Sequence, residues 1–149
     1  MDRETGKTIA SVKAEETTLF TLPGRQWGVL LGPENVQAKN MTLGLSVFPA
    51  GSAPGAHIHP VEEEMIYVVS GLGRLVGPAV TVALEPGVAV YVPPGVEHAT
   101  IAEEGGEPLR LIMAFSPAVV AKDFVRRAAG SDPRESTLDG KDGDRIWRL

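Results

Sequence analysis

The three histidines of this chain lie in two short motifs that have the residue types of a metal site. His57 and His59 form an H-I-H triplet, Glu64 follows His59 by five positions, and His98 ends the segment PPGVEH. Imidazole is the commonest metal-binding side chain, and a carboxylate oxygen can complete the ligand set of a divalent first-row metal. These four residues are our candidate metal ligands.

Strand geometry would bring the four residues together. Residues two apart on a strand face the same side, so His57 and His59 should point together into the interior. A strand that runs back after the turn at Pro60 would carry Glu64 beside the two imidazoles. His98 would arrive from a third segment, behind the rigid turn PPG.

Simpler interpretations compete with the metal site. Two buried, hydrogen-bonded structural histidines could also share one face. An acidic triplet is more often a solvated turn, and Glu62 and Glu63 stand directly before Glu64. Glu63 would point to the opposite face of the strand, whereas Glu64 is in phase with apolar residues, so we favour Glu64.

The rest of the chain predicts an all-β domain. Short runs rich in Val, Ile, Leu and Tyr alternate with Gly and Pro turns, a pattern typical of a sandwich or barrel. The expected strands are Leu19–Leu22, Gln26–Leu31, Lys39–Phe48, His57–His59, Glu64–Ser70, Gly73–Val76, Val80–Leu84, Ala89–Val92, Glu97–Ala102 and Leu109–Phe115.

One short C-terminal helix is predicted. Ser116 would be its N-cap and Pro117 its first-turn proline, with the helix continuing over Ala118–Ala129. We divide the chain into an N-terminal arm (1–18), a β-domain (19–130) and a C-terminal tail (131–149). The Ile146-Trp147 pair in that tail would pack on a neighbouring surface or cap a pocket.

Composition restricts the class of protein. The formal net charge of −5 argues against a nucleic-acid surface, and no apolar run of about 18 residues exists to span a membrane. The first residues, MDRETGKTIASVKAEET, lack the apolar segment of a secretory signal, and the chain has no Cys. We therefore expect a cytoplasmic protein that binds neither nucleic acid nor membrane.

Both motifs resemble those of the cupin family. The segment GSAPGAHIHPVEEEMIYVVSG, residues 51–71, is similar to the first cupin motif at every spacing, and GVAVYVPPGVEH, residues 87–98, is similar to the second. The resemblance covers roughly Leu43 to Phe115 and identifies a single-domain cupin of the cupin-2 type, in the RmlC-like jelly-roll superfamily. The second motif often carries Asn at the position of Ala102. The alanine here leaves the cavity wall at this position without a hydrogen-bonding side chain.

The resemblance implies a double-stranded antiparallel β-barrel, or jelly roll, that forms a homodimer. It places the metal ligands on His57, His59, Glu64 and His98, for one divalent transition metal per chain. Iron is our first choice, with Mn, Ni, Zn or Cu as alternatives.

Other residues are candidates for lesser roles. Trp27, Phe48, Met113 and Phe115 could line a pocket, although core packing is the commoner role for such residues. Arg74 and Arg110 could meet an anionic substrate or lie on the surface. Tyr67, out of phase with Glu64, is expected on the outer face or at a dimer contact.

The leading functional hypothesis is a metal-dependent enzyme that acts on a small organic molecule, with Fe(II)-type dioxygenase chemistry first. Glu64 could leave the metal and act as a catalytic base. The alternative is a non-redox lyase, decarboxylase, isomerase or polyketide-type cyclase, and the second alternative is a non-catalytic metal- or ligand-binding module. Since all three histidines are committed to metal, no separate histidine base exists.

Overall fold

The computed structural model describes residues 8–129, so the Ile146-Trp147 segment lies outside the described residues. Within that range the chain is mostly β-structure with three short helices. The elements are a 3₁₀ helix (Ala14–Glu16), β1 (Phe20–Leu22), β2 (Arg25–Leu31), α1 (Pro33–Val36), β3 (Thr42–Phe48), β4 (Glu63–Ser70), β5 (Gly73–Val76), β6 (Thr81–Leu84), β7 (Ala89–Val92), β8 (Ala99–Ala102), β9 (Leu109–Ser116) and α2 (Ala121–Ala129).

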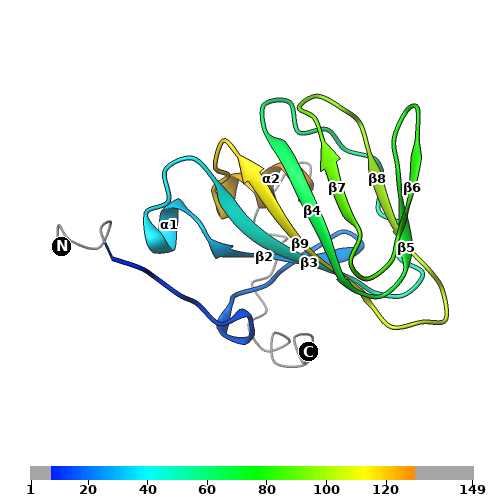
Figure 1. The fold of residues 1–149 in the computed structure, drawn as a ribbon, viewed down its shortest axis with the longest axis horizontal. Coiled ribbons are helices and arrows are strands. Elements are labelled where there is room, and N and C mark those ends of the chain that lie inside the picture. The colour runs from blue at the N-terminus through cyan, green and yellow to red at the C-terminus, as the bar shows by residue number, and fades with distance from the viewer. Residues whose placement is uncertain (1–7, 130–149) are drawn as a thin grey trace.

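The strands form two antiparallel sheets (Figure 1). The larger sheet has six strands in the order β1-β2-β3-β9-β4-β7, and the smaller has three in the order β6-β5-β8. One apolar core lies between the sheets and includes Val68 and Leu111 of the larger sheet and Leu75 and Leu84 of the smaller. Strand residues alternate between this core and the outside, as the period of two requires.

The sheets do not close into the barrel that we expected. Among the described residues, no ladder joins the larger sheet to the smaller, so the arrangement is an open pair of sheets consistent with a jelly roll. The expected strand His57–His59 is also wrong, since this segment makes only one isolated bridge, between His57 and His98. Pro54 and Pro60 flank it, and proline has no N–H to donate to a ladder.

Most other strands lie within a few residues of their predicted bounds. The largest differences are at two starts: β3 begins at Thr42 instead of Lys39, and β8 begins at Ala99 instead of Glu97. The short helix α1, Pro33–Val36, was not predicted.

The predicted start of the C-terminal helix is wrong. Ser116 continues β9 and pairs with Glu63 of β4, and α2 begins only at Ala121. Between them, the hydroxyl of Thr42 donates to the carbonyl of Val119 at 2.8 Å and accepts from its N–H at 3.0 Å. This buried contact uses both backbone groups of Val119, so the helix cannot begin before it.

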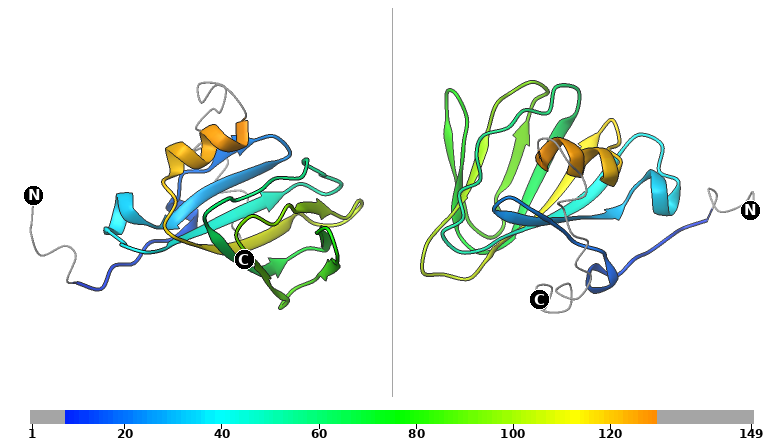
Figure 2. Two further views of the ribbon diagram at one scale, coloured as in Figure 1. Left: turned by 90° about the horizontal axis from the view of Figure 1, so that it is seen from above. Right: turned by 180° about the vertical axis from the view of Figure 1, so that it is seen from behind.

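The segment before β1 packs on the outer face of the larger sheet. Leu19 is fully buried there with Leu45 and Val47, in a second apolar cluster. A Cβ atom built on Gly28 would lie 2.6 Å from the carbonyl oxygen of Thr18, so only glycine allows this close approach. The helix α2 lies beside β1 at the opposite face of the sheet (Figure 2).

Candidate metal centre

The three histidines meet in the interior, between the two sheets. One ring nitrogen of each histidine lies within 4.8 Å of those of the other two. The ring centroids of His57 and His98 are 4.3 Å apart, and those of His59 and His98 are 5.4 Å apart. His59 and His98 are buried, and His57 is partly buried. The three histidines therefore converge as we expected, but they lie on loop segments joined by one β-bridge and not on a continuous strand.

Backbone hydrogen bonds hold the two motifs together. The N–H of His57 donates to the carbonyl of His98 at 2.9 Å, and the N–H of His98 donates to the carbonyl of His57 at 3.0 Å. The N–H of Gly95 donates to the carbonyl of His59 at 2.8 Å, from a turn in which Gly95 has a φ of 77°. Glycine is the residue that adopts this left-handed conformation without strain, so the PPG turn positions both motifs.

Glu64 lies beside the histidines on the inner face of β4. It pairs with Phe115 of β9 and Val92 of β7, and it is 5% exposed. Its Oε1 atom lies 3.3 Å from Nε2 of His98 and 3.9 Å from Nε2 of His59.

The other two glutamates of the triplet have different partners. Glu63 faces the outside, where its carboxylate accepts a hydrogen bond from the Tyr91 hydroxyl at 2.9 Å. Glu62 is 8% exposed and forms an ion pair with Arg127 of α2 at 3.2 Å. The structure therefore separates the three carboxylates and leaves Glu64 nearest to His98 and His59.

The buried surroundings change the protonation of the imidazoles. Burial, reinforced by the neighbouring imidazoles of His98 and His59, lowers the pKa of His57 to about 3. Burial also lowers the pKa of His59, against the opposing effect of Glu64. For His98, burial acts in the same direction, but Glu64 and the carbonyl of Val96 outweigh it and raise the pKa. His57 and His59 therefore stay neutral at neutral pH, which is the form that binds metal.

The donor atoms fit a metal ion. Nε2 of His59 and Nε2 of His98 are buried and have no hydrogen-bond partner among the described residues, although buried polar groups normally have one. Nδ1 of His98 lies 2.9 Å from the carbonyl oxygen of Val96, a contact that directs Nε2 of the same ring toward Glu64. Metal–nitrogen bonds are about 2.0–2.1 Å long, so nitrogens this close can share one ion after small side-chain rotations.

A small inner cavity of about 20 Å³ lies against the three histidines and Glu64. That volume is close to the space that one water molecule needs. The cavity is lined by all four predicted wall residues, Trp27, Phe48, Met113 and Phe115. They are also buried core residues, so each of them both lines the cavity and packs in the core. Thr100 lines the cavity, whereas Ala102, which we placed on its wall, is buried in the core and does not line it.

A larger pocket of about 290 Å³ opens next to the cavity. His57, His59, Arg25 and Phe124 line both spaces. Arg74 and Arg110, which we considered as contacts for an anionic substrate, line neither. Arg74 is exposed on β5, and Arg110 contacts Ser70 at 3.2 Å and Glu107 at 3.6 Å.

Arg25 is a site residue that sequence reasoning missed. It begins β2 directly after the turn Pro23-Gly24, and it shares the inward phase of Trp27. The hydroxyl of Ser52 donates to the carbonyl of Gly24, which ties this turn to the loop that carries His57. The only signal in the sequence was an arginine after a Pro-Gly turn, and that pattern is common on surfaces.

Phe124 of α2 was also missed. Its ring stacks on Trp27 with centroids 4.0 Å apart, and it contacts the rings of His59 and Phe115 at 5.8 Å and 5.5 Å. Phe124 therefore lies between the inner cavity and the outer pocket. An apolar residue in a C-terminal helix carries no sequence signal for such a position.

Comparison with known proteins agrees with this geometry. A family model described as a cupin domain matches residues 44–115. Uncharacterized protein SCO3923 of Streptomyces coelicolor is 33% identical over 82 residues, 55% of this chain and 75% of that protein. Dimethylsulfoniopropionate lyase DddW of Ruegeria pomeroyi is 30% identical over 93 residues, 62% of this chain and 59% of the lyase.

Among solved structures, an RmlC-like cupin from Shewanella frigidimarina superposes with a TM-score of 0.63 at 23% sequence identity. The match covers 79% of this chain and 97% of that one. The matched region begins within β3 and ends within β9, and so includes both motifs and all four candidate metal ligands. With two facing sheets, two motifs and a triad that could bind a metal, the chain belongs to the cupin family.

Proposed function

We propose that the protein is a metal-dependent enzyme whose metal is held by His57, His59, His98 and Glu64. The observation that carries this proposal is the pair of buried Nε2 atoms, of His59 and His98, which make no hydrogen bond to any described residue. Glu64 supplies a carboxylate oxygen beside them. The set has the nitrogen and oxygen chemistry that first-row divalent metals prefer.

The substrate would enter through the outer pocket. That pocket is slightly smaller than the range of about 300–1,000 Å³ typical of sites for small molecules, which favours a small substrate. His57 and His59 face it, so a bound molecule would lie against the metal ligands. A bound metal would supply Lewis-acid polarisation of a substrate oxygen. Phe124 and Trp27 would limit the entry of water into the inner cavity.

We favour non-redox lyase-type chemistry on this site, because a relative at 30% identity is named a lyase. In such a reaction Glu64 could leave the metal and accept a proton, since every histidine would be used as a ligand. Fe(II)-dependent dioxygenase chemistry is the second candidate. It is favoured by the donor set, because four protein ligands leave two positions of an octahedral metal for substrate and dioxygen.

The metal site is tested by elemental analysis of protein that was purified without oxygen and then incubated with Fe(II) or Zn(II). We expect one metal per chain in the wild-type protein, a sharp loss in His59→Ala, and a partial loss in Glu64→Gln. Glu63→Ala is the matched control, because its side chain faces the outer surface, and it should keep the wild-type metal content. Equal loss in His59→Ala and Glu63→Ala would overturn the ligand assignment.

Oxygen consumption separates the two reaction classes. Once a substrate is found, lyase-type turnover should proceed at the same rate with and without dioxygen. A strict requirement for dioxygen, with stoichiometric uptake, would replace the lyase interpretation by the dioxygenase one. A fully metal-loaded protein whose metal has no exchangeable water would instead favour the non-catalytic binding module.

A further inference from the structure

Arg25 lines both spaces of the site, the outer pocket and the inner cavity. Arg25 lines the outer pocket together with His57 and His59, and it also lines the inner cavity together with Glu64 and His98. Few side chains line both. A group bound to Arg25 would therefore lie next to the metal ligands and still reach the outer pocket.

Arg25 is partly buried and has no ion-pair or hydrogen-bond partner for its side chain within residues 8–129. Burial lowers its pKa, and the nearby carboxylate of Glu64 opposes that effect. An arginine nevertheless keeps its charge in proteins. A partly buried cation that makes no hydrogen bond or ion pair loses hydration without replacement, so its position next to the pocket needs a reason beyond stability.

The other charged groups around the pocket are already paired. Arg127 also lines the outer pocket, but its guanidinium contacts Glu62 at 3.2 Å and 3.4 Å. Glu64 lies 3.3 Å from His98, where it would share the charge of a bound metal. Arg25 is thus the cation in this pocket whose donors are available for a ligand.

We propose that Arg25 binds the carboxylate of a small carboxylic-acid substrate and thereby holds that substrate against His57 and His59. This proposal rests on the proposed function, because it names the substrate class of that same site. Arginine presents two parallel N–H donors that match the two oxygens of a carboxylate. Among the described residues this pocket offers one arginine whose donors are available, which suits the single charge of a carboxylate better than the higher charge of a phosphate.

A purely electrostatic role is the competing explanation. Arg25 could act only through its electrostatic attraction to Glu64, beside the histidines. In that case, removal of the guanidinium would change metal affinity and would have no direct effect on ligand binding. Substitution of Arg25 would therefore change the affinity for the carboxylate in the proposed role and the affinity for the metal in the electrostatic role.

Glycolate is a suitable probe, with its neutral isostere glycolamide and inorganic phosphate as comparisons. We would titrate each compound into zinc-loaded and metal-free protein and follow binding by NMR, including the guanidinium Nε–H resonances. In wild-type protein, glycolate should shift the Arg25 resonance in both forms and should bind more tightly than glycolamide or phosphate. Phosphate binding tighter than glycolate binding would overturn the choice of a carboxylate.

Three variants test the residue itself. Arg25→Gln should weaken glycolate binding about tenfold or more, which corresponds to about 1.4 kcal/mol, while zinc content stays at the wild-type value. Arg25→Lys keeps the charge but loses the paired donors, so it should recover only part of the affinity. Arg74→Gln, which removes an exposed arginine from β5, should bind glycolate like the wild type.

Unchanged glycolate affinity in Arg25→Gln would overturn the proposal, and so would an equal loss in Arg74→Gln. Loss of zinc from Arg25→Gln with unchanged glycolate binding to the metal-free protein would assign Arg25 to the electrostatic role instead. A wild-type protein that takes up no metal would contradict the proposed function alone. The metal-free titration would then still decide whether Arg25 binds a carboxylate.

Discussion

The ring of Phe124 in α2 stacks on the indole of Trp27 in β2, with centroids 4.0 Å apart and planes 15° from parallel. This contact attaches the C-terminal helix to the inner face of the larger sheet, directly above the histidines. Because Phe124 also contacts His59, α2 is both a part of the core and a wall of the candidate metal site.

Phe124→Ala should therefore destabilise the fold and open the site. Removal of a buried Phe ring typically costs about 3 kcal/mol or more in the free energy of unfolding, and urea denaturation would measure this loss. Release of bound zinc to a chelator should also become faster. Lys122→Ala, an exposed change in the same helix, should alter stability by no more than about 0.5 kcal/mol. Equal effects of both changes would contradict the assigned role of Phe124.

The convergence of the candidate metal ligands could be predicted because its signals are local. The H-I-H triplet and the PPG turn each lie within a few residues, and the hydrogen bond from Gly95 to His59 joins them. The alternation of side chains along a strand correctly placed Glu64 beside the imidazoles, since β4 runs from Glu63 to Ser70 with Glu64 facing inward.

The parts that sequence reasoning missed depend on contacts between distant segments. The start of α2 is set by the hydrogen bonds between Thr42 and Val119, which no local pattern around Val119 reveals. Arg25 lies near the histidines where the hydroxyl of Ser52 ties the turn between β1 and β2 to the loop that carries His57. The prediction of a closed barrel was wrong for a local reason. Pro54 and Pro60 flank the histidine loop, and proline has no N–H to donate to the ladder that would join the two sheets.

The ion pair between Glu62 and Arg127 should make stability depend on pH. Burial alone would raise the pKa of Glu62, but hydrogen bonding and attraction to Arg127 outweigh it, and the pKa is lowered. A lowered carboxylate pKa stabilises the fold above the unfolded-state value, about 4.3, and this stabilisation is lost as the pH falls through the folded-state value.

We expect Glu62→Gln to lose about 1 kcal/mol of stability at pH 7, since Arg127 is partly exposed and the pair is screened by solvent. The difference in stability from the wild type should shrink toward zero as the pH falls below the pKa of the unfolded carboxylate and then through the lower pKa of the folded one. Urea denaturation at a series of pH values would measure it, with Glu63→Gln as the control. A difference that persists unchanged in acid would show that the effect is not electrostatic.

Zinc should stabilise the folded protein, because a ligand that binds only the native state adds to the free energy of unfolding. At a free zinc concentration 100 times the dissociation constant, the gain is about 2.7 kcal/mol, and a chelator should reverse it. Thermal melts with and without zinc would measure the effect. His98→Ala should abolish the zinc-dependent increase in Tm, whereas Glu63→Gln should retain it. An equal increase in both variants would place the stabilising zinc elsewhere.

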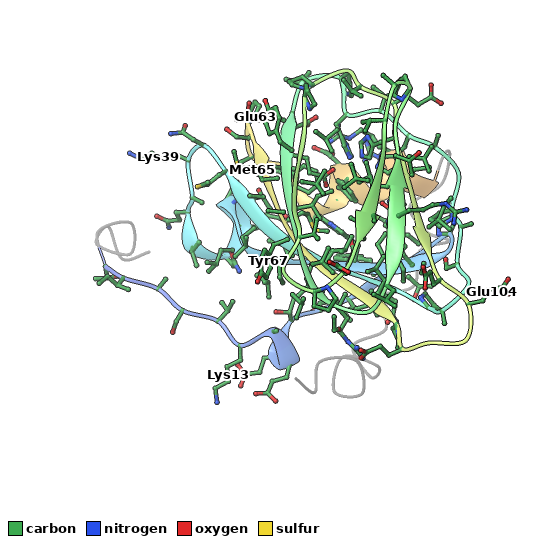
Figure 3. The ribbon with its side chains drawn as sticks, turned by 45° about the vertical axis from the view of Figure 1, so that its right-hand side comes forward. Lys13, Lys39, Glu63, Met65, Tyr67 and Glu104 are labelled. Atoms are coloured by element: carbon green, nitrogen blue, oxygen red, sulfur yellow. The ribbon has the colours of Figure 1, made fainter. Side chains whose placement is uncertain are left out.

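The outer face of β4 and β7 should form the contact of a homodimer. Met65 and Tyr91 pair directly across these strands and are 57% and 51% exposed, and Tyr67 is 51% exposed. Figure 3 shows Glu63, Met65 and Tyr67 following one another along β4. Aromatic residues and Met are enriched in interfaces, and a symmetric pair of identical faces is the commonest way for a chain to cover such a patch.

A second copy of this chain is the expected occupant. Two molecules that each carry a net charge of −5 repel over most of their surface, and this patch has only one carboxylate, Glu63, which is bound to Tyr91. Light scattering should give twice the chain mass for the wild type and a single chain mass for Tyr67→Lys. Val80→Lys, an exposed apolar residue before β6, should leave the dimer intact. A monomeric wild type, or dissociation by Val80→Lys alone, would contradict this interface.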